Sequence, residues 1–273
     1  MRSLGGRGLG RIPGVTRAHA MAKSLLKSTY TEVDGHRMYL DPQDSLELSL
    51  RGGYSPLQTS VVKEHVGPGD TVVDVGAHIG YYTLIFARLV GAKGRVFAFE
   101  PDPENFALLG KNVRLNGYTN VVIEPKAVSS RTEASRLFVD PGTANRRMFF
   151  PDESGRSVAI DAVRLDDYFG PDQRVDFLKI DIEGFEVAAL EGMSRLIARN
   201  PGLKIMTEFY PFGLARSGND PRAYLEMLTA FGFVLHDIDS GRGVVAPDSV
   251  ADIASRYPAG DDHAATNLLC LRG

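Results

Sequence analysis

The sequence predicts an α/β protein built on a doubly wound, mostly parallel sheet, and three observations support this. Strand-like and helix-like segments alternate from residue 31 to about residue 236, which favours parallel strands connected by helices. Most strand-like segments are nearly continuous apolar runs, as expected for strands with both faces buried. The length of 273 residues, with 43% hydrophobic and 24% charged residues, is ordinary globular composition.

Seven segments are predicted to form the strands of this sheet. The first five are 71–76, 95–100, 120–128, 176–181 and 203–209. Two more, 232–238 and 267–272, follow with no convincing helix between them, so they predict an antiparallel pair at the sheet edge. Residues 140–157 are rich in Pro, Gly, Arg and Ser and predict an insertion loop.

Three helix starts are marked by a capping side chain directly before a proline, which suits the first helical position. The three pairs are Ser55-Pro56, Asp102-Pro103 and Asp220-Pro221. Gly117 and Gly232 stand where two of these helices should end. One further helix is predicted after residue 181 from the apolar spacing of Val187, Leu190, Met193 and Ile197.

The first 30 residues differ from the rest of the chain because they carry six Lys or Arg and no acidic residue. They lack the apolar stretch of about 7–15 residues that a signal peptide needs. We therefore predict a flexible basic leader over 1–30, with a basic arm for an anionic partner as the alternative. A single domain over 31–273 follows, with a lead-in segment over 31–66.

Charge and cysteine content exclude several classes of function. Lys and Arg number 31 and Asp and Glu 34, so with a net charge of −3 nothing global argues for nucleic acid or an anionic membrane as the main partner, and neither is predicted. No apolar run approaches the roughly 20 residues of a membrane-spanning helix. A single cysteine, Cys270, fits a cytoplasmic protein and excludes both a disulfide scaffold and a cysteine-based zinc cluster.

A glycine turn follows the first predicted strand in "VVDVGAHIGYYTL", where Asp74, Gly76 and Gly80 precede an apolar helical segment. Such a turn lets the backbone approach a ligand at the carboxyl edge of the sheet. Twenty residues after the second glycine, the next strand ends in Glu100 and Pro101. An acidic side chain there can accept hydrogen bonds from both ribose hydroxyls, so the pair predicts a bound nucleoside.

The spacing and charge of this turn favour S-adenosylmethionine over a dinucleotide. A dinucleotide site has the pattern G-x-G-x-x-G, whereas this chain has Gly76-x-x-x-Gly80. Asp74 would repel a pyrophosphate but suits a ligand that carries a sulfonium and an ammonium. Two alternatives are kept beside this prediction. One is a nicotinamide-dependent oxidoreductase, and the other is a non-catalytic cofactor-binding module of the same fold.

Several segments in order resemble the FkbM family of S-adenosylmethionine-dependent methyltransferases. They are "VVDVGAHIGYYTL", "VFAFEPDPENFALLGKNVRLNG", "AVSS", "LDDYF", "VDFLKIDIEGFEVAALEGM" and "TEF". The resemblance implies a Rossmann-like, seven-stranded sheet whose last strand is antiparallel. It also implies methyl transfer to a hydroxyl of a sugar, glycolipid or secondary metabolite. The predicted cofactor-binding residues are Asp74, Gly76, Ala77, His78, Gly80, Glu100, Pro101, Ala127 and Asp181. His78 departs from the family pattern, which usually has Asn there.

A second polar cluster lies in "FLKIDIEGFE". Alternate residues of a strand share a face, so Lys179 and Asp181 should project together, with Asp181 at the ligand-binding end. Glu183 follows in the loop, and the next strand brings Glu208 to the same edge. A hydroxyl acceptor is a weak acid and needs a base or a metal ion, so Asp181 and Glu183 are the first catalytic candidates.

The other assignments at this edge stay open. Lys179 and His78 are catalytic candidates of second rank, since an ion pair explains Lys179 more simply and a turn histidine is often a hydrogen-bonding spacer. Asp181 and Glu208 could hold Mg²⁺ or a similar divalent cation, or could bind sugar hydroxyls without a metal.

The predicted acceptor is a small molecule or saccharide, and a homodimer is compatible with the sequence. Six aromatic side chains are candidates for the acceptor pocket: Tyr54, Tyr81, Tyr82, Phe149, Phe150 and Tyr210.

Overall fold

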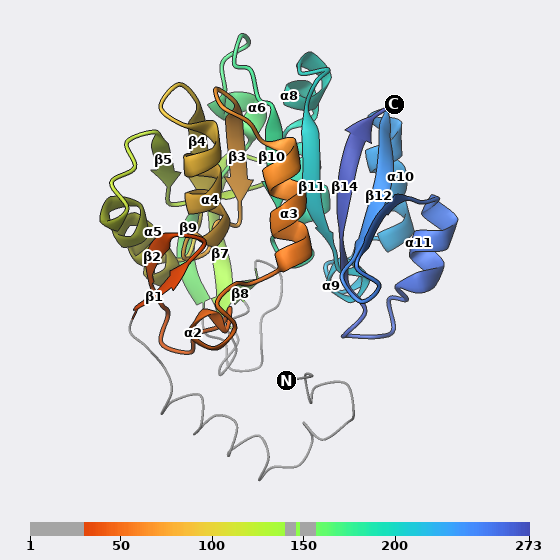
Figure 1. The fold of residues 1–273 in the computed structure, drawn as a ribbon. Coiled ribbons are helices and arrows are strands. Elements are labelled where there is room, and N and C mark those ends of the chain that lie inside the picture. Colours follow the sequence, from red (N-terminus) through yellow and green to blue (C-terminus); the bar gives the residue numbers. More distant parts are fainter. Residues whose placement is uncertain (1–29, 140–145, 148–156) are drawn as a thin grey trace.

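The computed structural model describes residues 30–139, 146–147 and 157–273. Its main sheet has eight strands in the order β13-β12-β14-β11-β10-β3-β4-β5 (Figure 1). The bounds are β3 Thr71–Val75, β4 Arg95–Phe99, β5 Val121–Glu124, β10 Phe177–Ile180, β11 Lys204–Phe209, β12 Phe233–Asp239, β13 Val244–Pro247 and β14 Thr266–Arg272. Strands β5, β4, β3, β10 and β11 are parallel neighbours, whereas β14 is antiparallel to both β11 and β12. The doubly wound, mostly parallel sheet with an antiparallel last strand is therefore confirmed.

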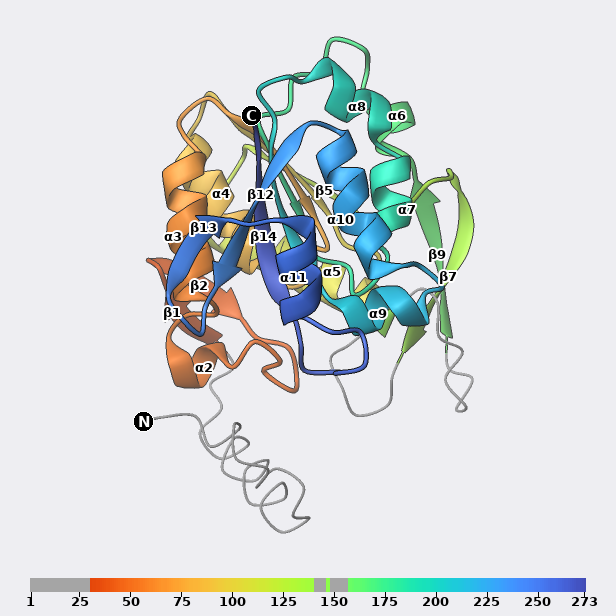
Figure 2. The same cartoon turned by 90° about the vertical axis from the view of Figure 1, so that its right-hand side faces the viewer.

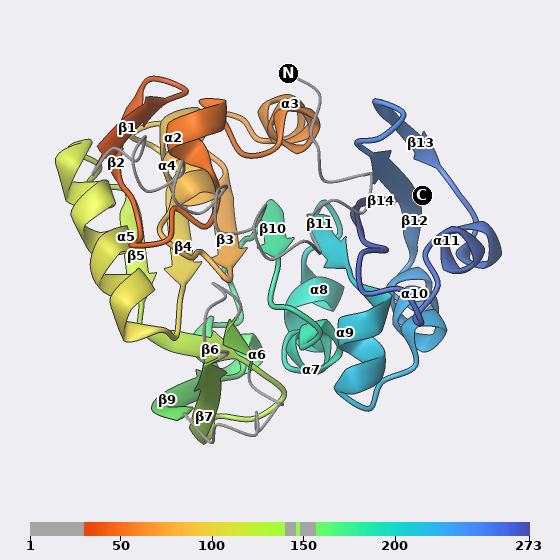
Figure 3. The ribbon, with the colours of Figure 1, turned by 90° about the horizontal axis from the view of Figure 1, so that it is seen from below.

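Helices cover both faces of this sheet (Figure 3). One face packs against α3 Pro56–His65, α4 Tyr81–Val90 and α5 Pro103–Leu115, and is called the α4 face. The opposite face packs against α6 Leu165–Tyr168, α7 Glu186–Glu191, α8 Ser194–Arg199, α9 Pro211–Arg216, α10 Pro221–Ala230 and α11 Val250–Arg256. Each face has its own buried apolar cluster, which explains why the strands read as continuous apolar runs.

The lead-in segment packs on the α4 face. It contains the hairpin strands β1 Tyr30–Val33 and β2 His36–Tyr39, followed by α2 Leu48–Arg51 and α3. Asn112 of α5 fastens the hairpin, because its side chain accepts a hydrogen bond from the Tyr39 N–H at 2.7 Å and donates one to the Tyr39 carbonyl at 3.1 Å. The hairpin is thereby fixed against the main domain.

A smaller sheet has the strand order β6-β9-β7-β8 and lies on the side of α7 (Figures 2 and 3). Its strands are β6 Lys126–Val128, β7 Glu133–Val139, β8 Arg146–Arg147 and β9 Ser157–Val163. The predicted single strand 120–128 is therefore wrong: it divides at Pro125, which has no backbone N–H, into β5 of the main sheet and β6 of the small one.

The C-terminal region corrects two more predictions. A strand and a helix, β13 and α11, lie between the segments predicted to follow each other directly. The antiparallel pairing of β12 with β14 is confirmed, but β14 is inserted between β12 and β11, and β13 forms the edge. Helix α11 begins at Ser249, whose hydroxyl accepts a hydrogen bond from the Asp252 N–H at 3.1 Å.

The predicted helix after residue 181 is two short helices, α7 and α8, which are separated at Gly192 and Met193. Gly192 lies against the backbone of Ser129, where a Cβ atom would come within 1.9 Å of the Ser129 carbonyl oxygen. This close approach explains why residue 192 is a glycine. The helix starts at Ser55, Asp102 and Asp220 are confirmed. The Asp102 and Asp220 side chains accept backbone hydrogen bonds in the first turn, whereas the predicted capping role of the Ser55 side chain is wrong, since it makes no such bond in the described structure.

Two sequence predictions lie wholly or largely outside the described residues: the leader over 1–30 and the insertion loop over 140–157. Among the residues that are described, no helix combines the length and apolarity needed to span a membrane.

Candidate active site

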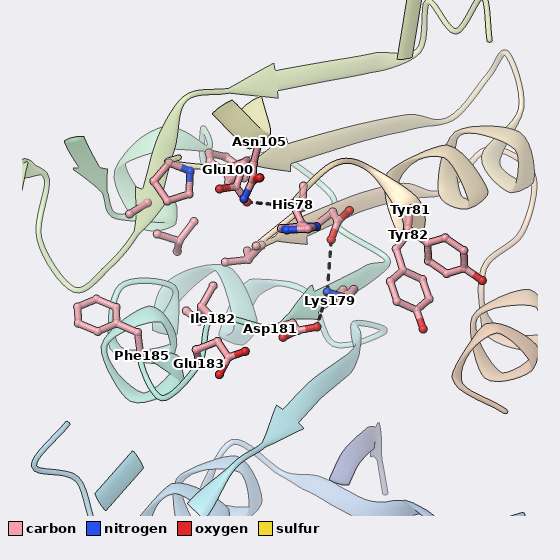
Figure 4. Close-up of a pocket in the computed structure, with 18 of the residues that line it drawn as sticks. His78, Tyr81, Tyr82, Glu100, Asn105, Lys179, Asp181, Ile182, Glu183 and Phe185 are labelled. Carbon is pink, nitrogen blue, oxygen red and sulfur yellow. Dashed lines mark hydrogen bonds and ion pairs between the residues drawn. The ribbon is translucent and has the colours of Figure 1, made fainter. Parts of the chain in front are cut away.

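A cavity of about 220 Å³ lies at the carboxyl ends of β3, β4 and β10. Figure 4 shows most of the residues that line it, with Glu100 and Asn105 toward one side and Lys179 and Asp181 toward the other. Ten of the predicted cofactor-binding and catalytic residues line this cavity: Asp74, Gly76, Ala77, His78, Glu100, Pro101, Ala127, Lys179, Asp181 and Glu183. The structure thus brings both predicted polar clusters into one pocket.

The turn after β3 depends on unusual backbone conformations. Gly76 has a φ of 79°, and a Cβ atom there would come within 2.0 Å of the Asp181 carbonyl oxygen. His78 has a φ of 52°, a left-handed conformation in which Asn, Asp and His are enriched among residues other than glycine. This explains how a histidine can occupy this position of the turn.

Glu100 is buried and organises this turn. Its Oε2 atom accepts a hydrogen bond from the His78 N–H at 2.8 Å, and its Oε1 atom accepts one from the Asp102 N–H at 2.9 Å. Burial raises the pKa of Glu100 to about 7, against the opposing effect of these two hydrogen bonds. The carboxyl group therefore links the glycine turn to the start of α5.

Lys179 bridges two carboxylates on the α4 face of the sheet. In the parallel pairing of β10 with β3, Lys179 lies opposite Asp74. Its Nζ atom is 3.1 Å from Asp181 Oδ2 and 3.9 Å from Asp74 Oδ1. Burial disfavours the charge on Lys179, but the charges of Asp181 and Asp74 outweigh burial and raise its pKa. Lys179 is therefore a cation in a buried ion pair and a poor candidate for a base.

Asp74 is completely buried, and burial raises its pKa despite the opposing charge of Lys179. Its Oδ2 atom accepts a hydrogen bond from the Thr83 hydroxyl at 2.6 Å, whereas Oδ1 has no hydrogen-bond partner in the described structure. Such a buried acceptor on a cavity wall is suited to a ligand that carries a donor or a cation.

Glu186 is a site residue that sequence reasoning missed. It is fully buried, and its Oε1 atom accepts hydrogen bonds from the backbone N–H groups of Ile182 and Gly184, both at 3.2 Å. Burial raises its pKa to about 7. These bonds hold the loop that carries Glu183, whose φ is 56°. The sequence did contain a sign of Glu186, because it is the last residue of the segment "DIEGFE", which also carries Asp181 and Glu183.

Two predicted residues, Gly80 and Glu208, do not line the cavity, whereas His78 does. Gly80 caps α4 away from the cavity wall, and a Cβ atom there would come within 2.8 Å of Leu109 Cδ1. Glu208 does not line the cavity, and burial raises its pKa well above the usual value, with the charge of Asp181 adding to the effect. Burial lowers the pKa of His78, and its Nδ1 atom has no partner among the described residues.

The described part of the chain contains no group of three or more His, Cys, Asp or Glu side chains placed to hold a metal ion. Asp181 and Glu208 thus lack a third protein ligand of these types there. The described residues therefore do not fit a Mg²⁺ site.

Three of the six aromatic candidates for the acceptor pocket, Tyr54, Tyr81 and Tyr82, line the cavity. Tyr210 does not, and Phe149 and Phe150 lie outside the described residues. The structure adds wall residues that the sequence did not indicate: Ser45, Leu46, Asn105, Lys126, Val128, Leu137, Ile182 and Phe185. Ser45 comes from the lead-in segment, where its hydroxyl donates to Asp41 Oδ2 at 2.7 Å.

Gly76→Ala is expected to lower the free energy of unfolding by about 2–4 kcal/mol, because it combines an unfavourable backbone conformation with a backbone clash. Gly117→Ala is the matched control: its φ is 71°, but a Cβ atom there would have nothing within 4 Å. We expect that control to cost about 1 kcal/mol. Urea denaturation compares the two, and equal losses would show that the close approach at Gly76 is not tight.

Comparisons with known proteins identify similar chains. Residues 74–235 match the family model described as the methyltransferase FkbM domain. "Methyltransferase 1" of Beauveria bassiana is 27% identical over 149 residues, a match that spans 46% of this chain and 59% of that protein. "Hexuronic acid methyltransferase AglP" of Haloferax volcanii is 27% identical over 172 residues, or 61% of this chain and 68% of that protein.

A third relative, "31-O-demethyl-FK506 methyltransferase FkbM" of Streptomyces tacrolimicus, is 37% identical over 89 residues, or 33% of this chain and 34% of that protein. Among solved structures, the methyltransferase FkbM of Methylobacillus flagellatus aligns with a TM-score of 0.47 and 17% identity. That alignment covers 78% of this chain and 50% of that one.

Proposed function

Because this chain belongs to the FkbM family of methyltransferases, we propose that it transfers a methyl group from S-adenosylmethionine to a hydroxyl oxygen of a sugar, glycolipid or secondary metabolite. The observation that carries the proposal is that Glu100 and Asp181, from the ends of two strands, line one cavity on either side of the Gly76 turn. The Streptomyces relative, which is named for an O-demethyl substrate, supports oxygen as the acceptor atom.

The residues of the cavity fit the cofactor. Glu100 would accept hydrogen bonds from ribose hydroxyls, and the Oδ1 atom of Asp74, which has an ion pair with Lys179 but no hydrogen bond in the described structure, would face the cationic part of the ligand. Apolar side chains complete the wall, among them Pro101, Ala127 and Phe185. Bound there, S-adenosylmethionine supplies an electrophilic methyl group on its sulfonium.

Asp181 is suited to hold the acceptor hydroxyl. Its side chain is 31% exposed and lines the cavity, while Lys179 fixes the Oδ2 atom at 3.1 Å. A carboxylate in this position can orient a hydroxyl and receive its proton. Lys179 acts through Asp181 as a positioning residue, and Glu186 acts through the loop at Glu183.

Isothermal titration with S-adenosylmethionine and S-adenosylhomocysteine tests the first half of the proposal, and a folded protein that binds neither contradicts it. Incubation of labelled S-adenosylmethionine with cell extract and identification of the labelled product test the second half. A protein that binds the cofactor but labels nothing would support the non-catalytic alternative.

The family match is to methyltransferases, so it does not support the oxidoreductase alternative. The cytoplasmic location and the homodimer stay predictions.

Glu100→Ala is expected to weaken S-adenosylmethionine binding by about 1.5–3 kcal/mol, the range for hydrogen bonds to a charged acceptor. The pKa of about 7 adds a pH dependence. The ionised carboxyl is the better acceptor, so wild-type affinity should fall as the pH drops through 7, and the variant should show no such fall.

Glu104→Ala is the matched control for Glu100→Ala. Glu104 lies in the first turn of α5, is exposed and does not line the cavity. This control should bind the cofactor normally in a titration at pH 6 and pH 8. Unchanged affinity in a folded Glu100→Ala protein would show that another residue holds the ribose.

A further inference from the structure

Asn112 is a buried amide of α5 that joins two other segments of the chain. Its Oδ1 atom accepts a hydrogen bond from the Tyr39 N–H at 2.7 Å, and its Nδ2 atom donates to the carbonyls of Tyr39 at 3.1 Å and Ile79 at 2.8 Å. A primary amide has one oxygen acceptor and two N–H donors, so both donors and the acceptor are in use. One side chain therefore holds β2 and the glycine turn at the same time.

Each of these two segments leads to a wall of the active-site cavity. Ile79 belongs to the turn between β3 and α4, three residues of which line the cavity. Two residues after Tyr39, the Asp41 side chain holds the wall residue Ser45. Its Oδ2 atom accepts from the Ser45 hydroxyl at 2.7 Å and from the Ser45 N–H at 3.0 Å. Asn112 thus connects the turn at the cofactor end to the wall that the lead-in segment forms.

Asn116, four residues further along the chain, offers a comparison within the same contact. Its Oδ1 atom accepts from the Arg37 N–H at 3.0 Å, and its Nδ2 atom donates to the Arg37 carbonyl at 2.8 Å. This is the same pair of bonds, two residues earlier in β2. The Nδ2 atom of Asn116 also donates to the Asn112 carbonyl at 2.8 Å, which is part of α5 itself. Both asparagines therefore hold the hairpin, but of the two only Asn112 is bonded to the glycine turn.

We propose that Asn112 is a positioning residue that makes the β1–β2 hairpin part of the cofactor site, so that docking of the hairpin and binding of S-adenosylmethionine stabilise each other. The inference deepens the proposed function and rests on it. The turn that Asn112 holds at Ile79 also donates the His78 N–H to Glu100 at 2.8 Å. Without Asn112 the Ile79 carbonyl would lose its bond, and the ligand would have to order the turn at a cost in affinity.

Coupling of this kind is reciprocal. If the docked hairpin raises the affinity for the cofactor, the bound cofactor must stabilise the docked hairpin by the same factor. Residues 30–39 are all described, and none of them lines the cavity. A ligand in the cavity therefore acts on the hairpin amides through the protein, and a merely structural Asn112 would leave their hydrogen exchange unchanged by the ligand.

Hydrogen exchange of the wild-type protein, measured by mass spectrometry with and without S-adenosylhomocysteine, is the first test. Saturating ligand should slow exchange in the hairpin by at least about fivefold, the lower end of typical coupling between sites. Peptides from β12 and β13 serve as the reference for global unfolding, which any ligand suppresses. Hairpin exchange that slows no more than this reference would overturn the proposal. This measurement needs no variant.

Asn112→Ala and its matched control Asn116→Ala are the second test, with circular dichroism to verify the fold. Titration with S-adenosylhomocysteine should show a loss in affinity of about tenfold or more for Asn112→Ala and less than about threefold for Asn116→Ala. Protection of the hairpin by the ligand should disappear in Asn112→Ala and persist in Asn116→Ala. Equal losses in affinity would overturn the proposal.

Failure of the proposed function gives a different result. In that case the folded wild-type protein binds neither S-adenosylmethionine nor S-adenosylhomocysteine. Exchange of residues 76–80 without ligand then decides whether Asn112 positions the turn. Faster exchange in Asn112→Ala than in Asn116→Ala would support that role, and equal exchange would overturn it.

Discussion

Asp181→Asn is expected to keep the fold and the S-adenosylmethionine affinity but to lose on the order of 10²–10⁴ in turnover, as expected for the loss of a general base. Asp181 follows the carboxyl end of β10, and its backbone N–H donates to the Val75 carbonyl at 3.1 Å. Asparagine can keep that backbone bond and can still accept from Lys179. What it loses is the ability to take a proton from the acceptor hydroxyl.

The effect should fall on the chemical step because methyl transfer needs strict alignment. The acceptor oxygen must lie within about 3–3.5 Å of the reacting carbon. A carboxylate that orients and deprotonates this hydroxyl makes its strongest interaction in the transition state, so its loss lowers kcat more than it raises KM. Glu100 in contrast should act on binding.

Asp176→Asn is the matched control for Asp181→Asn. Asp176 precedes the same strand at its amino end, where its Oδ2 atom accepts from the Thr71 N–H at 2.9 Å, and it does not line the cavity. Initial rates with labelled cofactor compare the two variants. Near-wild-type turnover in Asp181→Asn would reduce this aspartate to a structural partner of Lys179. Loss of activity in EDTA that Mg²⁺ restores would instead assign a metal to it.

The sequence predicted those features of the site that follow from the position of a residue within its own strand. The period of two in a strand placed Lys179 and Asp181 on one face, and the strand-end rule brought Glu100 and Asp181 to one edge. Asp74 as the second partner of Lys179 was not predicted. That contact depends on the register between β3 and β10, which are separated by about a hundred residues.

The missed features have identifiable causes. Helix α11 spans only Val250–Arg256, so its apolar spacing of Val250, Ile253 and Ala254 covers barely two turns, although this spacing and the cap at Ser249 were readable. Pro125 signalled the division between β5 and β6. Ser45 and Leu46 reach the cavity only through the long-range packing of the lead-in segment, which leaves no local pattern.

Lys179→Met is expected to lower the free energy of unfolding by about 3–5 kcal/mol, the cost of leaving a buried charge without its partner. Asp74 is fully buried and would keep only the hydrogen bond from Thr83 as compensation. Methionine retains most of the volume of lysine, so packing against the Tyr82 ring, 5.2 Å from Nζ, should change little. The expected loss is therefore electrostatic.

The pH dependence of this loss has a defined sign. Burial already holds the pKa of Asp74 above its unfolded value, and removal of Lys179 would raise it further. An acid with a raised folded pKa favours the folded state below its unfolded pKa and loses that contribution as pH rises through the folded pKa. The penalty in Lys179→Met should therefore be largest at neutral and alkaline pH and smaller near pH 5.

A double-mutant cycle distinguishes a structural from a catalytic role for Lys179. Lys179→Met/Asp74→Asn removes the uncompensated charge while the new amide can still accept from Thr83, so urea denaturation should show most of the stability restored. A coupling of at least about 1.5 kcal/mol is expected between these contacting residues. If Lys179→Met kept full stability and the double variant gained nothing, the buried ion pair would not be the role of Lys179. If that stable single variant nevertheless lost turnover, Lys179 would be assigned a catalytic role, because its charge would then act on the acceptor hydroxyl rather than on the stability of the folded state.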